Sequence, residues 1–231
     1  MIERYSLSQA QHSIEKRFKA QCEDSFDLRY NAAPTQVLPI ITLANPNRIK
    51  LFNWGTEPSS NNKKIASKLI NAPLLQLTEK VFYKNALKSR RCLVIADGFY
   101  VWKSISKKGQ IPYRITMADE ELFTMAGIYE TYENLEGFKI GTFSIITHPA
   151  PPSIANLTQD APIIIPIEFE EQWLQNTGSL EQNLELLTSI TLPELKSYVV
   201  SPLVNNLAND RKNLLNPAPP ADQFGNYSLF D

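Results

Sequence analysis

Residues 90–102 read Arg90-Arg91-Cys92-Leu93-Val94-Ile95-Ala96-Asp97-Gly98-Phe99-Tyr100-Val101-Trp102, and this stretch has the residue pattern of β-structure. Runs of β-branched and aromatic residues are typical of strands. Here two such runs flank an Asp-Gly pair, which is the two-residue signature of a tight turn between antiparallel strands. The sequence therefore predicts strands over 92–96 and 99–103, joined as a hairpin at Asp97-Gly98.

Outside this stretch the sequence predicts more strands than helices. Pro39 would make the strand at 37–43 an edge strand, because proline has no amide to donate. Ser8 and Gln11 have the spacing of a capping box, and Thr78 is a candidate N-cap. We expect a polar loop at 58–64, further strands at 49–54, 113–117, 122–128, 138–147, 163–165 and 195–201, and helices at 8–19, 77–88, 168–175 and 181–190. Many strands with few intervening helices indicate an α+β fold with mixed, mainly antiparallel sheets.

Length and composition predict one domain over residues 1–216, followed by a Pro-rich tail over 217–231. The chain has 231 residues, of which 43% are hydrophobic, enough to bury a sizeable core. We find neither an apolar run of about 20 residues nor a signal peptide, so we expect a cytoplasmic protein without a membrane span. Two cysteines and two histidines lack metal-ligand spacing. We expect no metal, no cofactor and a monomer.

Charge is strongly segregated along the chain, although the net charge is only −1. Residues 1–47 carry five basic and five acidic side chains, residues 48–114 carry fourteen and three, and residues 115–231 carry four and sixteen. A local basic surface attracts a polyanion even when the whole protein is neutral, so the middle segment is a candidate nucleic-acid interface. Alternatively, the basic and acidic segments neutralise each other in the fold.

Several ordered blocks together resemble one known family. They are Glu3-Arg4-Tyr5-Ser6-Leu7, Arg29-Tyr30-Asn31-Ala32-Ala33-Pro34-Thr35-Gln36, Trp54-Gly55, Leu69-Ile70-Asn71-Ala72, residues 90–102, Ala126-Gly127-Ile128-Tyr129-Glu130 and Val200-Ser201-Pro202-Leu203-Val204-Asn205. In order and spacing they are similar to the SOS response-associated peptidase (SRAP) family of the DNA damage response. The resemblance implies a pseudo-barrel of bent sheets with peripheral helices. It also implies a protein that shields abasic sites in single-stranded DNA by linking covalently to them.

The resemblance also implies a nucleophile that this chain lacks. In the family a cysteine at position 2, freed by removal of the initiator methionine, offers an amine and a thiol that close a thiazolidine on the sugar aldehyde. This chain has Ile2 there, and so bulky a second residue is expected to leave Met1 in place.

Four further positions depart from the family pattern. The family's proton-transferring glutamate matches Val101, and its histidine matches Thr158. An arginine that contacts DNA in the family matches Asp160, and Asn71 is kept while the arginine two residues later is Pro73. Nucleophile and acid/base groups act as a unit, so these losses indicate a pseudoenzyme.

The remaining candidates concern DNA contacts. We expect these at Arg4, Trp54, Asn71, Lys80, Arg90 and Arg91, with further phosphate contacts among Lys63, Lys64, Lys68, Lys84 and Lys88. Phe99 and Trp102 are expected in the core, and the acids beside Cys22 make it a poor nucleophile. The leading hypothesis is a SRAP-like fold with weak single-stranded DNA binding and no covalent capture. The alternatives are an enzyme that uses the Met1 amine and a protein-interaction module without nucleic acid.

Overall fold

The computed structural model describes residues 1–55, 69–134, 136–175, 178–191, 194–222 and 224–226. Its strands form two sheets, and the expected α+β class is confirmed. The smaller sheet has the order β14 (Leu195–Val199), β9 (Gln110–Met117), β8 (Gly98–Ser104), β1 (Tyr5–Leu7) and β3 (Arg29–Ala32). The larger has the order β12 (Asp160–Pro162), β11 (Lys139–Pro149), β10 (Phe123–Glu133), β7 (Arg91–Ala96), β4 (Val37–Thr42), β5 (Asn45–Trp54) and β2 (Gln21–Cys22).

The larger sheet closes on itself. β11 pairs with β5 in parallel, so the strands from β11 through β10, β7 and β4 to β5 form a barrel. Two short strands extend it: β6 (Asn71–Pro73) pairs with β11, and β13 (Ile164–Ile165) pairs with β10. Closure pairs the edges of β11 and β5 with each other, edges that would otherwise be open to association with other chains.

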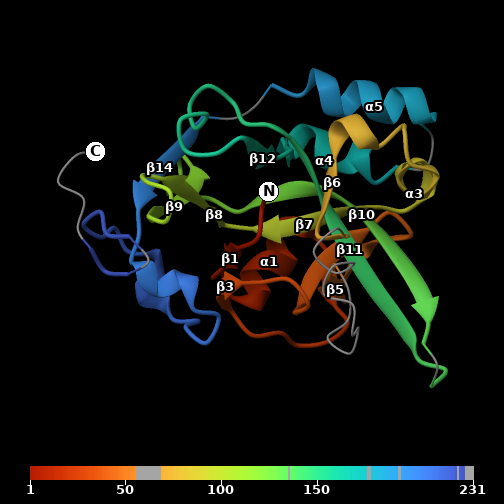
Figure 1. The fold of residues 1–231 in the computed structure, drawn as a ribbon. Helices are drawn as coiled ribbons and strands as arrows, with labels where there is room; N and C mark the ends of the chain where they lie inside the picture. Colours follow the sequence, from red (N-terminus) through yellow and green to blue (C-terminus); the bar gives the residue numbers. More distant parts are fainter. Residues whose placement is uncertain (56–68, 135, 176–177, 192–193, 223, 227–231) are drawn as a thin grey trace.

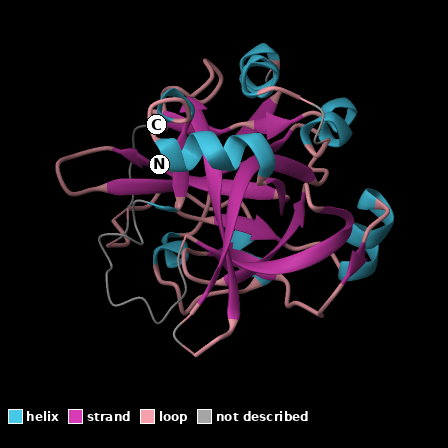
Figure 2. Cartoon of the chain, turned by 90° about the vertical axis from the view of Figure 1, so that its right-hand side faces the viewer, coloured by secondary structure: helices cyan, strands magenta, loops and turns pink. Residues whose placement is uncertain are grey.

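Helices lie around the sheets rather than between them, as Figure 2 shows. They are α1 (Gln11–Phe18), α3 (Val81–Ser89), α4 (Ile167–Trp173) and α5 (Leu180–Ser189), with 3₁₀ turns η1 (Leu74–Gln76), η2 (Pro202–Asn205) and η3 (Lys212–Leu215). Among the described residues, no helix is long and apolar enough to cross a membrane. The expected loop at 58–64 lies outside the described residues.

The hairpin predicted at Asp97-Gly98 is wrong. The strands on either side, β7 and β8, belong to different sheets, so the chain passes from the barrel to the smaller sheet at Asp97. Gly98 does not have the positive φ that a hairpin glycine adopts in a type I′ turn. It provides space instead, since a Cβ on Gly98 would lie 2.7 Å from Nε of Arg114.

Other elements differ from the sequence prediction in their ends. α1 begins at Gln11, because the backbone and hydroxyl of Ser8 bind the Asp97 carboxylate instead of capping a helix. α3 begins at Val81, with Lys80 rather than Thr78 as the N-cap. β4 is not an edge strand, since it pairs with both β5 and β7. Pro39 is tolerated because the pairing with β7 begins only at Ile40.

Two hydrophobic clusters hold the molecule together. The main core fills the barrel and continues under the smaller sheet, and it includes Ile2, Trp54 and Trp173. A second cluster, which we call the small cluster, consists of Tyr100, Val200, Val204 and Leu214, with Trp102 and Tyr198 packed against it. In the predicted tail, Pro217 forms a β-bridge with Val200 and Ala221 is buried, so residues 217–222 pack against the protein.

Candidate functional site

The start of the chain is anchored in the structure through Ile2 and β1. β1 pairs with both β3 and β8, and this places the N-terminus beside β12 (Figure 1). Ile2 is fully buried in the main core. Its carbonyl accepts a hydrogen bond from Nδ2 of Asn71 at 2.8 Å, which ties the start of the chain to β6.

The α-amine of Met1 has a carboxylate partner. Its nitrogen lies 3.3 Å from Oδ2 of Asp160, and the two side chains are 54% and 49% exposed. Thr158 positions this part of the chain, because its hydroxyl donates to the Asp160 carbonyl at 3.0 Å. The ion pair is thus accessible to solvent and is held by residues at the start of β12.

Two cavities meet at this ion pair. The first, which we call the β8 cleft, has a volume of about 670 Å³ and is lined in part by Arg4, Val101, Trp102 and Thr158. The second, the α3 cleft, has a volume of about 380 Å³ and is lined by Met1, Asn71, Pro73, Gln76, Lys80, Tyr83, Thr147 and Asp160. Met1 and Asp160 line both, so their ion pair stands between the two cavities.

The structure brings together the four positions that match the family's catalytic residues, of which the sequence analysis expected only Asn71 to be kept. Ile2 and Asn71 are hydrogen-bonded, while Val101 and Thr158 line the β8 cleft next to Met1. Val101 is only 3% exposed and belongs to the main core. Neither valine nor threonine can carry a proton as a carboxylate or imidazole does.

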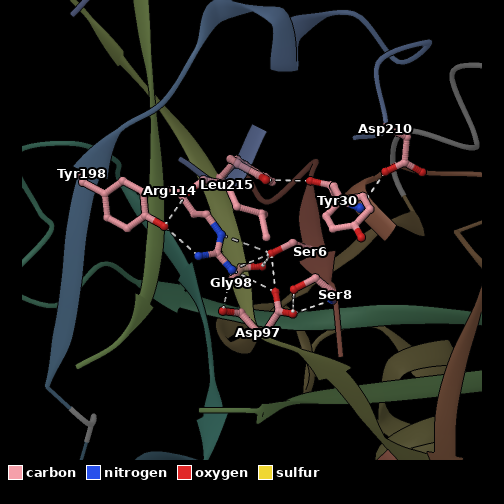
Figure 3. Close-up of polar contacts among 10 residues, drawn as sticks. Ser6, Ser8, Tyr30, Asp97, Gly98, Arg114, Tyr198, Asp210 and Leu215 are labelled. Carbon is pink, nitrogen blue, oxygen red and sulfur yellow. Dashed lines mark hydrogen bonds and ion pairs between the residues drawn. The ribbon is translucent and has the colours of Figure 1, made fainter. Parts of the chain in front are cut away.

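A buried polar network positions β1 and hence the N-terminus (Figure 3). The Asp97 carboxylate accepts hydrogen bonds from the Ser6 hydroxyl at 2.6 Å and from the Ser8 hydroxyl at 2.7 Å. It also pairs with Nη2 of Arg114 at 2.9 Å, and both side chains are almost fully buried. Arg114 donates in addition to the Tyr198 hydroxyl at 2.7 Å, which links β9 to β14.

Burial alone would lower the pKa of Arg114. The hydrogen bond to Tyr198 and the charge of Asp97 outweigh this effect, so its pKa is raised. The network therefore contains a stable cation and satisfied acceptors, which is the condition for a buried ion pair to hold a single geometry. Sequence analysis missed this network because its members are far apart in the chain.

Two of the residues predicted to contact DNA are buried in the structure. Trp54 is fully buried; its indole stacks on Phe143 at 6.4 Å between centroids and donates to the Ile70 carbonyl. Arg91 is also fully buried, and it donates to carbonyls of Trp173, Leu87, Lys88 and Gln175. Both are core residues, and neither presents a surface to a ligand.

Among the other predicted contacts Asn71 is buried, whereas Arg4, Lys80 and Arg90 lie at or near the surface. Arg4 lines the β8 cleft, and burial lowers its pKa even though Glu3 raises it. Lys80 is exposed at the α3 cleft, where it donates to Gln76. Arg90 pairs with Glu130 at 2.6 Å, so its charge is already matched. Lys63, Lys64 and Lys68 lie outside the described residues.

Charge segregation is partly neutralised by the fold. Arg90 in the basic segment pairs with Glu130 in the acidic one. The positive charges of Lys84 and Lys88 attract the carboxylate of Glu181, which also lies in the acidic segment. Arg4, Lys80 and Lys103 line the two clefts. Among the described residues, the basic segment is thus matched in part by the acidic one.

Neither cysteine offers a replacement nucleophile. Burial, together with Glu15, raises the pKa of Cys22 to about 12, and burial raises that of Cys92 further. A thiol attacks as the thiolate, so both are inert at neutral pH. Within the described part of the chain, no group of three or more His, Cys, Asp or Glu side chains could hold a metal ion.

Two features of the site were not predicted. Sequence analysis saw in Asp160 only a reversed charge, whereas the structure makes it the partner of the Met1 amine. Trp102 was expected in the core, but it is half-buried and lines the β8 cleft. The alternation of strand β8 could have indicated this, since Val101 and Trp102 face opposite sides of the sheet.

Comparison with known proteins gives a consistent result. The family model described as SOS response associated peptidase (SRAP) matches residues 1–207, and this chain belongs to that family. The abasic site processing protein YoaM of Bacillus subtilis is 34% identical over 189 residues, covering 80% of this chain and 83% of that protein. The rat abasic site processing protein HMCES is 27% identical, covering 84% of this chain and 66% of that protein.

Solved structures show the same fold. A Bacteroides thetaiotaomicron protein superposes with a TM-score of 0.80 at 25% identity, covering 93% of this chain and 99% of that one. A Bordetella bronchiseptica protein superposes with a TM-score of 0.70 at 21% identity, covering 86% of this chain and 99% of that one. The pseudo-barrel expected from the resemblance is therefore confirmed.

Proposed function

We propose that this protein binds single-stranded DNA at or near abasic sites but does not capture them as a stable crosslink. The family and its abasic-site-processing relatives support a DNA-related role. The observation that carries the loss of chemistry is the fully buried Ile2 at the start of β1. An isoleucine side chain has no thiol, and burial in the main core prevents any neighbour from taking its place.

The surrounding residues support the same conclusion. The Met1 amine is paired with Asp160, and the positions around it hold Val101 and Thr158. A covalent trap needs a nucleophile with groups that move protons to and from the aldehyde oxygen. Asp160 is the acidic side chain at the junction of the clefts, and its partner is an amine without an adjacent thiol.

The covalent half of this proposal is tested by incubating the protein with single-stranded DNA that contains one abasic site. Denaturing electrophoresis and intact-protein mass spectrometry should show no stable conjugate. The variant Ile2→Cys/Val101→Glu/Thr158→His, with Met1 removed, should form one, because it restores the amine and thiol on residue 2 together with the carboxylate and imidazole. A stable conjugate of the unaltered protein would contradict the proposal.

The binding half is tested by fluorescence anisotropy with labelled single-stranded DNA at two salt concentrations. Binding that weakens as salt rises is expected, because contacts to phosphates release counterions. If no salt-dependent association is seen at low ionic strength, the proposed binding of single-stranded DNA is wrong. We propose that the protein is a cytoplasmic monomer, and light scattering coupled to gel filtration tests the oligomeric state.

A second candidate function rests on the exposed Met1 amine, which lies beside both clefts. An amine can condense with a sugar aldehyde to an imine and release water. Asp160 would take the ammonium proton and return it to the departing hydroxyl. Borohydride reduction during incubation with abasic DNA, followed by peptide mapping, separates the two functions: an adduct on Met1 supports this one.

A further inference from the structure

The part of the chain that forms α4 and α5 carries only acidic charges. Residues 167–195 contain Glu168, Glu170, Glu171, Glu181, Glu185 and Glu194, and no lysine, arginine or histidine. Arg17 of α1 pairs with Glu170 at 2.9 Å, and the other acids of the two helices are exposed. An acidic surface repels a polyanion such as DNA, so the functions proposed above give this surface no role.

A groove of about 530 Å³ lies between α4 and α5, the two helices at the top of Figure 1. Phe169 and Leu186 form an apolar part of its wall, and Gln172, Gln182 and Asn183 add side-chain amides. Among the described residues that line the groove, Glu185 alone is charged. None of these residues lines the β8 cleft or the α3 cleft, so the groove is a separate site.

Asn183 is the feature of the groove that points to a ligand. Its side chain is almost fully buried, with the residue only 5% exposed, and its Nδ2 donates to the Leu87 carbonyl at 3.3 Å. Within the described residues, no donor binds its Oδ1. A Cβ on Gly178 would lie 2.9 Å from this oxygen, so the glycine keeps the space beside it open. A nearly buried acceptor without a donor is costly, and an N–H group of a ligand would satisfy it.

We propose that the groove between α4 and α5 binds a cationic peptide segment of a partner protein. Side-chain amides offer both donors and acceptors, so they match the N–H and C=O groups of a peptide backbone. Glu185 and the exposed acids around it attract lysine or arginine, while Phe169 and Leu186 receive an apolar side chain. α5 has 10 residues and is about 15 Å long, which about five residues of extended peptide cover.

An NMR titration of the isotope-labelled, full-length protein tests the proposal. The probe is a peptide of about eight residues made of lysine, leucine and alanine, long enough to cover the groove. The side-chain amide signals of Gln172, Gln182 and Asn183 should shift in a saturable manner at low salt, and the titration gives the dissociation constant. A peptide with glutamate in place of each lysine should leave these signals unchanged.

Removal of one charge tests the electrostatic part of the site. Glu185→Gln should weaken binding of the lysine peptide about twofold to fivefold, because it removes an exposed carboxylate from the wall of the groove. Glu121→Gln is the matched control, since Glu121 is equally exposed but lies between β9 and β10. It should leave the dissociation constant unchanged.

Addition of one methyl group tests the hydrogen bond to Asn183. Gly178→Ala should weaken binding about threefold to tenfold, because the methyl crowds the oxygen that the ligand is expected to reach. Gly178 does not have a positive φ, so alanine fits its backbone. Gly109→Ala is the control: its Cβ would lie 2.8 Å from Oγ of Ser106, between β8 and β9. Circular dichroism and thermal melting check that each variant is folded.

The outcomes separate a peptide site from unspecific attraction. Saturable shifts at the groove amides, weakened in Glu185→Gln and Gly178→Ala but not in their controls, support the proposal. No shift at millimolar peptide overturns it, and so do equal shifts with the glutamate peptide. Shifts of the same size around Glu121 would mean that the lysine peptide follows acidic charge anywhere on the surface, which also overturns it. If single-stranded DNA moves the groove amides instead, the groove is a nucleic-acid surface and the proposal is wrong.

Discussion

Ile2 performs a structural task at the position where the family resemblance implies a reactive residue. Its side chain is fully buried and its carbonyl is held by Asn71. Ile2 therefore contributes to the packing of the main core at the position where the family resemblance implies the nucleophile.

The contribution of Ile2 to stability can be measured. Ile2→Ala should lower the free energy of unfolding by about 2–5 kcal/mol, because it leaves a cavity in the main core. Ile2→Val should cost only about 0.5–1.5 kcal/mol. Urea denaturation followed by circular dichroism checks both, and equal stability of Ile2→Ala and the unaltered protein would show that the N-terminus does not pack in solution.

Asp160 should act against DNA binding. It carries a negative charge at the junction of the two clefts, where phosphates are expected to pass. Asp160→Asn removes a like charge worth about 1 kcal/mol at close range in water, so affinity for single-stranded DNA should rise roughly fivefold. Anisotropy measures the change.

The matched control for this prediction is Asp119→Asn. Asp119 is exposed beyond the end of β9, whereas the β8 cleft contains Gln110 at the other end of that strand. The same loss of charge there should leave affinity nearly unchanged. If both variants gain equally, the effect reflects net charge and not the position of Asp160.

His148 should make stability depend on pH. Burial lowers the pKa of its imidazole below the usual range, although the neighbouring backbone and Asp160 partly oppose this. The unfolded chain then binds a proton near pH 6.5, while the folded protein binds it only at lower pH. The free energy of unfolding should therefore fall as pH drops from about 7 through the folded pKa.

The variant His148→Asn should flatten this dependence. Urea midpoints at about pH 7.5 and pH 5 would show a smaller difference than in the unaltered protein. His12→Asn serves as the control, because His12 is exposed on α1. An unchanged difference in His148→Asn would assign the acid sensitivity to another group.

At the scale of elements, Asp97 is the point where the chain leaves the barrel and enters the smaller sheet. Its carboxylate holds β1 through Ser6 and Ser8 and holds β9 through Arg114 (Figure 3). Both strands belong to the smaller sheet, so this one buried side chain fixes that sheet at the point where the chain leaves the barrel. A change at this residue should therefore loosen both β1 and β9.

We expect Asp97→Ala to lower the free energy of unfolding by about 3–5 kcal/mol, because it leaves the Arg114 cation buried without its partner. Adding Arg114→Met should recover part of the loss, since the uncompensated charge is then gone. Denaturant titrations of both single variants and the double variant give the coupling energy. Strict additivity of the two substitutions would mean that the pair does not act as a unit.

The sequence predicted an element correctly where the local residue pattern determines it. The prediction was wrong where a residue distant in the sequence determines the structure. The strands of residues 90–102 follow from their β-branched pattern. Their assignment to two sheets depends on Arg114, which fills the space beside Gly98 and lies in another strand. Likewise, the family resemblance indicated the positions of Ile2, Asn71, Val101 and Thr158, but nothing local revealed that Asp160 would meet Met1.

At the scale of the whole molecule, the fold places a few cations of the described residues around the two clefts. Arg4 and Lys103 lie at the β8 cleft and Lys80 at the α3 cleft, while Arg90 is matched by Glu130. A net charge of −1 gives little general attraction for DNA. Binding should therefore depend on a few local contacts.

These local contacts predict the salt dependence of binding. Each phosphate contact on single-stranded DNA contributes about −0.7 to the slope of log K against log salt, so the three cleft cations give a slope of about −2. Anisotropy titrations at several salt concentrations determine the slope, and Lys80→Gln should reduce its magnitude by about one contact. A slope near zero, or one much steeper, would place the interface elsewhere.

The ion pair between Met1 and Asp160 has a practical consequence for any laboratory that produces this protein. A purification tag fused ahead of Met1 would turn the amine into an uncharged amide and thread extra residues out between the two clefts. Asp160 would lose its counter-charge, and the fused peptide would compete with nucleic acid for the same space. Preparations with tags at the front and at the rear should therefore give different DNA affinities.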